Sequence, residues 1–131
     1  MSDNIVIFTV FGSVIIGMLI GLFTIIYAKT EITPGKLDLW IKENPKLVII
    51  DVRSQEEYLS GHIKGAINID LYKNFKKIIS KYLKCATYVV YCERGYRSIL
   101  ACKYMKELGF EHVYDLKGGY LNYLNYISQK K

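Results

Sequence analysis

The stretch CERGYRS at residues 92–98 decides the fold, and it follows directly on the apolar run TYVVY at residues 87–91. The run is short, β-branched and aromatic, which predicts a buried strand. Residues 98–108 carry apolar side chains at helical spacing and end at Gly109, which predicts a helix. A cysteine at the end of a strand, followed by a loop and a helix, lies in a cradle of backbone N–H groups that can hold an anion.

Cys92 is the candidate nucleophile of this loop. Arg94 and Arg97 add fixed positive charge, so we expect Cys92 to be partly ionised to the thiolate near neutral pH. We expect the N–H groups of the loop to hold what the sulfur binds, and Ser98 to cap the helix that follows. The candidate substrate-binding residues are Glu93, Arg94, Gly95, Tyr96, Arg97 and Ser98.

The spacing from Cys92 to Arg97 distinguishes two families that use cysteine chemistry. Cysteine-dependent phosphatases have the pattern Cys-x5-Arg, whereas this chain has Cys-x4-Arg. The tighter loop resembles the active loop of the rhodanese family, the sulfurtransferases, in which it surrounds a single outer sulfur on the cysteine. A phosphatase or arsenate reductase stays as a minor alternative, because its loop is one residue longer.

A second match to the rhodanese family lies about forty residues upstream of Cys92. The segments DVR at 51–53, EY at 57–58 and GHIKGAIN at 61–68 resemble the N-terminal signature of that family in order and spacing. The resemblance extends over about residues 32–127. It implies a single α/β domain with a five-stranded parallel sheet.

The chain pattern predicts the same architecture, because predicted strands alternate with predicted helices. Helices are therefore expected on both faces of the sheet, with ligands at the carboxyl ends of the strands, where Cys92 falls. The predicted strands lie at Ile32, Leu47–Val52, Ala66–Ile69, Thr87–Tyr91 and His112–Leu116. The predicted helices are Pro34–Glu43, a short helix capped by Ser54 through Leu59, Leu71–Lys84, Ser98–Leu108 and Tyr120–Ser128.

The resemblance implies a relay of sulfane sulfur. Thiolate Cys92 attacks the outer sulfur of thiosulfate or a persulfide and becomes a persulfide, which then passes the sulfur to a thiol or another nucleophilic acceptor. Arg94 and Arg97 would orient an anionic donor. Glu93 departs from the small or neutral residues common in the loop and would oppose such donors. A persulfide carrier or docking module without significant turnover is the alternative, since it needs the same residues.

Several polar residues outside the loop have structural interpretations. Asp51 and Arg53 are expected to brace the fold near the site, with Arg53 pairing with an acid of the short helix, Glu56 or Glu57. His62 is expected to be structural rather than a general base. Cys102 is expected to be a small buried hydrophobe rather than a resolving thiol. The cysteine spacing matches no metal site, and neither a metal nor a cofactor is expected.

The N-terminal segment has a different character from the rest of the chain. Residues 5–28 contain no charge and are rich in Ile, Val, Phe and Leu, which predicts a transmembrane helix. Residues 1–4 lack Lys and Arg, which argues against a signal peptide. We therefore divide the chain into an extracytoplasmic N-terminus (1–4), a transmembrane helix (5–28) and a rhodanese-like domain (29–131).

Flanking charge predicts the orientation of this anchor. Basic residues follow the span and none precedes it, which places the C-terminal domain in the cytoplasm. Within the span, Ser13, Gly17 and Gly21 recur at four-residue spacing, a pattern typical of helix pairs that pack closely. A homodimer through this face is one interpretation; the other is that glycine is common in such spans.

The formal net charge of +6 raises the question of polyanionic partners. No nucleic-acid-binding motif accompanies it, so we expect no nucleic-acid partner. Five lysines fall in the predicted helix 71–84, and this basic face is either solvated or in contact with anionic lipid headgroups. The expected partners are therefore a small sulfur donor, a thiol acceptor and the membrane.

Overall fold

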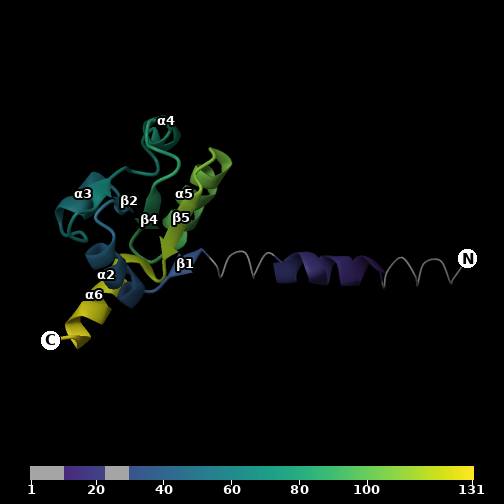
Figure 1. Cartoon of the computed structure of the whole chain (residues 1–131), viewed down its shortest axis with the longest axis horizontal. Helices are drawn as coiled ribbons and strands as arrows, with labels where there is room; N and C mark the ends of the chain where they lie inside the picture. Colours follow the sequence, from purple (N-terminus) through teal and green to yellow (C-terminus); the bar gives the residue numbers. More distant parts are fainter. Residues whose placement is uncertain (1–10, 23–29) are drawn as a thin grey trace, which may run out of the picture. The chain divides into compact units, whose positions relative to one another are not determined.

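A parallel sheet of five strands, in the order β1-β5-β4-β2-β3, organises the C-terminal part of the chain (Figure 1). The computed structural model describes residues 11–22 and 30–131. The strands are β1 (Glu31–Ile32), β2 (Val48–Asp51), β3 (Ile67–Asn68), β4 (Thr87–Tyr91) and β5 (His112–Leu116). All four pairings are parallel, which confirms the predicted sheet.

Successive side chains of β4 point to opposite faces of the sheet, and both faces are covered. Tyr88 and Val90 pack into one buried cluster, and Val89 and Tyr91 pack into the other. Both clusters are closed to solvent, because side chains of successive strand residues point to opposite faces and helices cover each face. The almost uninterrupted apolar run that marked β4 in the sequence follows from this double burial.

Two helices cover each face of the sheet. Helices α2 (Pro34–Glu43) and α6 (Gly119–Gln129) contact each other on one face, and α4 (Phe75–Ile79) and α5 (Tyr96–Glu107) contact each other on the opposite face (Figure 1). Thr33 caps α2 by accepting from the amide of Lys36, with Pro34 as the first helical residue. The short α3 (Gln55–Leu59) has the predicted capping box between Ser54 and Glu57.

The prediction of a helix over residues 71–84 was wrong in length, since only Phe75–Ile79 is helical. The amide of Leu71 donates to the carbonyl of Val52 at 3.1 Å, and residues 71–74 form turns and bends rather than a helix. Asn74 then adopts a left-handed conformation with φ of 56° before the helix begins. Leu71, Phe75 and Ile79 are buried at four-residue spacing, so the apolar pattern marked the buried face rather than a continuous helix.

The prediction that a helix begins at Ser98 also needs correction. Helix α5 begins at Tyr96, and Gly95 precedes it in a left-handed conformation with φ of 101°. Ser98 therefore lies inside the first turn and is not the cap. This earlier start shortens the loop that follows Cys92 and directs Ser98 inward, where it is completely buried.

The chain clusters into two units, Met1–Thr30 and Glu31–Lys131. In the first, residues 11–22 are helical and their apolar side chains are exposed. The rest of the predicted membrane span, 5–10 and 23–28, lies outside the described residues. Among the residues the structure describes, no helix is both long enough and apolar enough to cross a bilayer.

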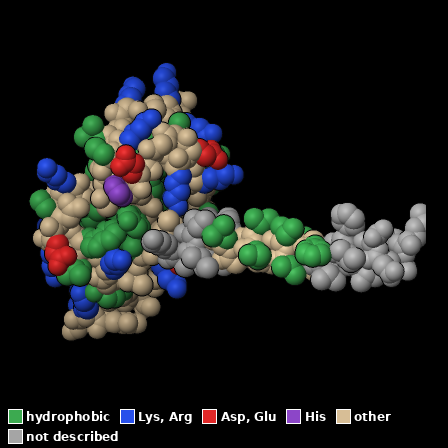
Figure 2. Space-filling model, turned by 45° about the vertical axis from the view of Figure 1, so that its right-hand side comes forward, with side chains coloured by type: hydrophobic (Ala, Val, Ile, Leu, Met, Phe, Trp, Pro, Cys, Tyr) green, Lys and Arg blue, Asp and Glu red, His purple; other side chains and the backbone are tan. Residues whose placement is uncertain are grey.

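Basic side chains are scattered over the second unit on the face drawn in Figure 2. They do not gather into one patch on that face. The five lysines between residues 71 and 84, at positions 73, 76, 77, 81 and 84, are all exposed. One of them, Lys76, lies over the ring of Tyr104, with 4.0 Å from its ammonium to the ring centroid. Contact of these lysines with lipid stays a prediction.

Candidate active site

Cys92 lies at the carboxyl end of β4, at the floor of a loop that α5 closes. Its side chain is 1% exposed. The amide of Gly95 donates to the sulfur at 3.1 Å, and the thiol donates to the Ser98 hydroxyl at 3.5 Å. Gly95 can direct its amide inward because it adopts a positive φ, which glycine tolerates without steric cost. The loop thus presents a backbone donor to the sulfur, as the sequence predicts.

The start of α6 holds the loop from outside. The amide of Tyr120 donates to the carbonyl of Cys92 at 2.8 Å, and the amide of Leu121 donates to the carbonyl of Glu93 at 3.1 Å. Gly119 makes this approach feasible: a Cβ there would lie 2.5 Å from the Cys92 carbonyl oxygen and 2.7 Å from that of Glu93. These bonds give the Cys92 and Glu93 carbonyls their hydrogen-bond partners on α6.

Arg53 ties the end of β2 to the loop. Its guanidinium binds the carboxylate of Asp51 at 2.8 Å and that of Glu93 at 2.8 Å, and donates to the carbonyl of Gly61 at 2.6 Å. Its side chain also stacks at 4.4 Å from the ring centroid of Tyr120. Arg53 and Asp51 are almost fully buried, and their hydrogen bonds raise the pKa of Arg53 against the opposing effect of burial. Asp51 and Arg53 therefore brace the fold beside the site.

Arg97, predicted from the sequence to act as a positive charge beside Cys92, forms an ion pair with Glu57. Two parallel hydrogen bonds of 2.8 and 2.7 Å join its guanidinium to both carboxylate oxygens. This pair lowers the pKa of Glu57 to about 2 and raises that of Arg97. The expected partner of Arg53 on the short helix was thus wrong: Glu57 binds Arg97, and Arg53 binds Glu93.

Comparison with known proteins places this arrangement in a family. The model of the rhodanese-like domain matches residues 33–126, which is most of the chain. The chain belongs to the rhodanese-like domain family. A tRNA uridine(34) hydroxylase of Legionella pneumophila (strain Corby) is 35% identical over 109 residues, covering 79% of this chain and 42% of that protein. The chain thus spans less than half the length of this curated relative.

Solved structures agree on the fold. A rhodanese-related protein from Thermoplasma volcanium superposes with a TM-score of 0.66 at 26% identity, covering 73% of this chain and 91% of the other. A human single-domain sulfurtransferase superposes with a TM-score of 0.64 at 24% identity, covering 73% and 96%. The second likeness shows the fold alone.

The remaining predicted site residues of the rhodanese-like domain lie at the mouth of the loop. Arg94 and Tyr96 are exposed, and Tyr96 is 80% exposed. Within the described part of the chain, no ion pair engages Arg94. Arg94 is therefore the cation of the loop that an incoming anion meets without displacing a carboxylate.

His62 and Cys102 occupy the structural positions expected of them. The Nδ1 atom of His62 lies 2.9 Å from the carbonyl oxygen of Tyr58, and the two rings stack at 3.8 Å. Cys102 lies in the buried cluster beneath α5. Burial raises the pKa of its thiol, which makes it a weak nucleophile.

Sequence reasoning missed two acids of the rhodanese-like site. Glu57 was assigned to the wrong arginine, although its capping-box position placed it on α3 correctly. Asp115, on β5, was not singled out at all, and it lies buried beneath α5 with one carboxylate oxygen unpartnered. An acid between Tyr114 and Leu116 in the strand 112–116 was the available signal, because charged residues are rarely buried in a sheet.

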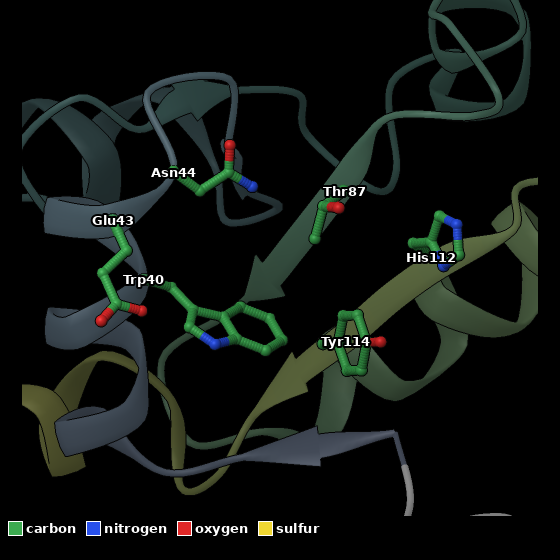
Figure 3. Close-up of a pocket in the computed structure, with 6 residues that line it drawn as sticks. All are labelled: Trp40, Glu43, Asn44, Thr87, His112 and Tyr114. Carbon is green, nitrogen blue, oxygen red and sulfur yellow. The ribbon is translucent and has the colours of Figure 1, made fainter.

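A hollow lies at the opposite edge of the sheet, at the amino ends of β4 and β5 (Figure 3). Its volume is about 310 Å³. Trp40 points toward Tyr114 across it, and their rings meet edge to face at 4.9 Å. It is lined by Trp40, Glu43, Asn44, Thr87, His112 and Tyr114. None of these residues belongs to the Cys92 loop.

Proposed function

We propose that the domain is a sulfurtransferase that moves sulfane sulfur through a persulfide on Cys92. The observation that carries the proposal is the 3.1 Å contact from the Gly95 amide to the Cys92 sulfur, inside a rhodanese-like loop. In the first step the Cys92 thiolate attacks the outer sulfur of the donor. A new S–S bond forms at Cys92, the donor's S–S bond breaks, and its electron pair leaves with the remainder of the donor.

The second step reverses this chemistry on an acceptor. An acceptor thiolate attacks the outer sulfur of the persulfide, and Cys92 leaves as a thiolate. The negative charge on the sulfur is stabilised in both steps by the preorganised amide of Gly95, which needs no rearrangement as the charge moves.

The charge pairs of the site favour a persulfide donor over thiosulfate. Arg53 is neutralised by Asp51 and Glu93, and Arg97 by Glu57. Because Glu93 is paired, it repels anionic donors less than an unpaired carboxylate would. Arg53 and Arg97 are also paired, so they attract a dianion such as thiosulfate only weakly. Arg94 is left to attract the donor, which suits a monoanionic persulfide better than thiosulfate.

An intact-mass experiment tests the proposal. The full chain is incubated with glutathione persulfide or thiosulfate, with Cys92→Ser as a matched variant. We expect a gain of about 32 Da, one sulfur atom, that Cys92→Ser does not show and that cyanide or a thiol removes. Absence of any adduct on the wild-type chain would contradict sulfur transfer and make a phosphate or arsenate assay the next step.

The burial of Cys92 favours one second candidate, a persulfide carrier without significant turnover. At 1% exposure the inner sulfur is shielded, which would protect a bound persulfide from attack at that atom. Steady-state release of thiocyanate from cyanide and donor separates the two roles. Many turnovers per chain indicate an enzyme, whereas one sulfur per chain indicates a carrier.

The hydroxylase named among the relatives is not part of this proposal. The chain covers 42% of that protein, so the named activity belongs to a longer polypeptide. What the two share is the rhodanese-like domain.

We also propose that residues 5–28 anchor the domain in a membrane, with residues 29–131 in the cytoplasm and Ser13, Gly17 and Gly21 as a dimer face. Support comes from the uncharged run and the basic residues that follow it. The protein should stay with the membrane after carbonate extraction. Gly17→Ile with Gly21→Ile should reduce cross-linking in detergent; unchanged cross-linking would exclude this face as the interface.

A further inference from the structure

A second hollow lies where α4 meets α5, on the face of the sheet opposite α2 and α6. We call it the α4 hollow. Its volume is about 370 Å³, at the small end of the range of roughly 300–1,000 Å³ that is usual for ligand pockets. None of its residues belongs to the Cys92 loop or to the hollow at the amino edge. It is lined by Leu71, Asn74, Phe75, Lys76, Lys77 and Tyr104.

The α4 hollow has an apolar floor and a polar rim. Leu71 and Phe75 are 7% and 2% exposed and belong to the buried cluster beneath α5, so they form the floor. Asn74, Lys76 and Lys77 are exposed and form the rim. Small-molecule sites have this composition, because apolar walls bury the body of the ligand and a few polar groups fix its orientation.

The charge of the rim is of one sign. Residues 71–84 hold five lysines and no acid. The only acid of α5, Glu107, lies 4.0 Å from Lys103. Within the part of the chain that the structure describes, no carboxylate pairs with Lys76 or Lys77. An anion can therefore bind these two ammonium groups without displacing a carboxylate.

Tyr104 holds Lys76 beside the hollow. The Lys76 ammonium lies 4.0 Å from the centroid of the Tyr104 ring, whose negative face attracts it. A lysine side chain has many rotamers, and ordering such a side chain on binding costs free energy. The contact with the ring restricts Lys76 before a ligand arrives, so less ordering is left for the binding step.

Asn74 is the third polar group of the rim. Among the described residues it is the only one other than glycine with a positive φ, 56°. Asparagine commonly enters this conformation with the help of a local hydrogen bond from its side chain. The Asn74 side chain does not cap α4, and it bonds to none of the residues described. Its amide is therefore available to donate at the rim, beside the two lysines.

We propose that the α4 hollow binds a small phosphate monoester whose organic part is apolar or aromatic. Near neutral pH a phosphate monoester carries a charge of about −1.5 to −2 and has three strong acceptor oxygens. It matches two ammonium groups and one amide, whereas a carboxylate has a single charge and two oxygens. The organic part fits against Leu71 and Phe75.

The polarity of the α4 hollow favours a soluble ester over a lipid in a bilayer. The lysines lie at the exposed rim and the apolar side chains at the buried floor. A soluble ester places its organic part on the floor and its phosphate among the lysines. A lipid headgroup meets basic residues with its phosphate while its chains stay in the bilayer, so it leaves the floor unused. The site uses nothing of the Cys92 loop and is independent of the proposed sulfur transfer.

Phenyl phosphate is the probe that tests the site. The full chain in a nonionic detergent is titrated with phenyl phosphate and, separately, with inorganic phosphate at constant pH and ionic strength. The backbone amide ¹H–¹⁵N signals report where each anion binds. We expect saturating shifts at residues 74–77 and 104, and an affinity for phenyl phosphate about 5- to 10-fold higher than for inorganic phosphate, as burial of part of the ring requires.

Two outcomes of these titrations would overturn the proposal. Equal affinities for the two anions would show that phosphate alone is recognised, as in contact with a lipid headgroup. Shifts that do not saturate, or that appear only outside the α4 hollow, would show that no site exists there. Neither outcome bears on sulfur loading of Cys92, so a failure of the site is distinct from a failure of the proposed function.

Lys77→Met and Lys81→Met separate the site from the general positive charge of residues 71–84. Lys77→Met removes a charge that lines the hollow and should weaken phenyl phosphate binding about 3- to 10-fold. Lys81→Met is the matched control, because it removes the same charge from an exposed lysine that does not line the hollow. Its affinity should stay within about twofold of the wild type, since salt screens distant charges. Equal losses in the two variants would overturn a localised site.

Asn74→Gly tests the amide without disturbing the backbone. Glycine adopts a φ of 56° without steric cost, so the turn before α4 is preserved, and an unchanged melting temperature checks this. We expect phenyl phosphate binding to weaken about 3- to 10-fold, because a donor to a charged group is lost. Wild-type affinity in Asn74→Gly would show that Asn74 serves the backbone alone, and would overturn the site as proposed.

Discussion

The two edges of the sheet differ in how their space is used. At the carboxyl edge, the Cys92 loop is filled by short contacts: backbone amides on the sulfur and on two carbonyls, and two arginine–carboxylate pairs. At the amino edge, Trp40 and Tyr114 border an open hollow of about 310 Å³. None of the residues that border this hollow donates to the Cys92 sulfur, whereas the Gly95 amide does so at the other edge. The comparison teaches that converging donors, rather than a hollow, mark the candidate active site.

The largest effect at the carboxyl edge is expected from Arg53→Leu. It leaves the buried Asp51 carboxylate and the half-buried Glu93 without their cation, and should cost about 3–5 kcal/mol of unfolding free energy. Urea denaturation measures this loss. Arg97→Leu is the control: its pair with Glu57 is partly exposed, so about 1 kcal/mol is expected. Equal losses would contradict the different burial of the two pairs.

Gly119→Ala tests the tight contact between α6 and the loop. The added methyl would meet the Cys92 and Glu93 carbonyls, so we expect a loss of about 3 kcal/mol, from backbone strain and overpacking together, and weaker sulfur loading at Cys92. Thermal unfolding and intact mass measure the two effects. Gly65→Ala is the matched control, since Gly65 also has a positive φ but open space around its Cβ. It should show only the strain, about 1–2 kcal/mol, with loading unchanged.

Glu57→Gln removes the charge of the Arg97 pair while glutamine preserves the capping-box geometry at that position. The wild type should be more stable by about 1 kcal/mol at pH 7. The pKa of Glu57 is lowered in the folded state, to about 2, so this advantage is complete above its ordinary value near 4.5 and disappears as pH falls toward 2. Chemical denaturation at several pH values checks this; a difference that persists at pH 2 would contradict it.

The amino edge should respond least. His112→Ala removes an exposed ring from the hollow and should change stability by less than about 0.5 kcal/mol. Sulfur loading of Cys92 should match the wild type, because His112 starts β5 while the loop follows the other end of β4. A clear loss of sulfur loading in His112→Ala would show that the two edges are coupled and would contradict the separation between them.

The order of the elements could be predicted from the sequence because a strand that is buried on both faces has an almost continuous run of apolar residues. The run 87–91 is apolar throughout, and β5 matches its predicted bounds His112–Leu116. The segment 71–84 could not be predicted correctly. Its buried side chains have helical spacing, but the bond from the Leu71 amide to Val52 is a tertiary contact that no local pattern reveals.

The site was predictable where the chain is continuous and less so where distant segments meet. Cys92 and the Gly95 amide follow from one loop. The arginine partners do not, because Arg53 meets Glu93 and Arg97 meets Glu57 across forty residues each. Acids lie near both arginines, and which carboxylate each arginine binds depends on how α3 packs beside the loop. The sequence does not reveal this packing.

The bonds from α6 to the loop have a consequence for the order of synthesis. The amides of Tyr120 and Leu121 hold the carbonyls of Cys92 and Glu93, and they belong to the last helix of the domain. A ribosome makes Cys92 well before it makes those amides. The nascent chain therefore lacks two hydrogen bonds of the Cys92 loop until α6 emerges, so the loop is completed only when almost the whole domain has been synthesised.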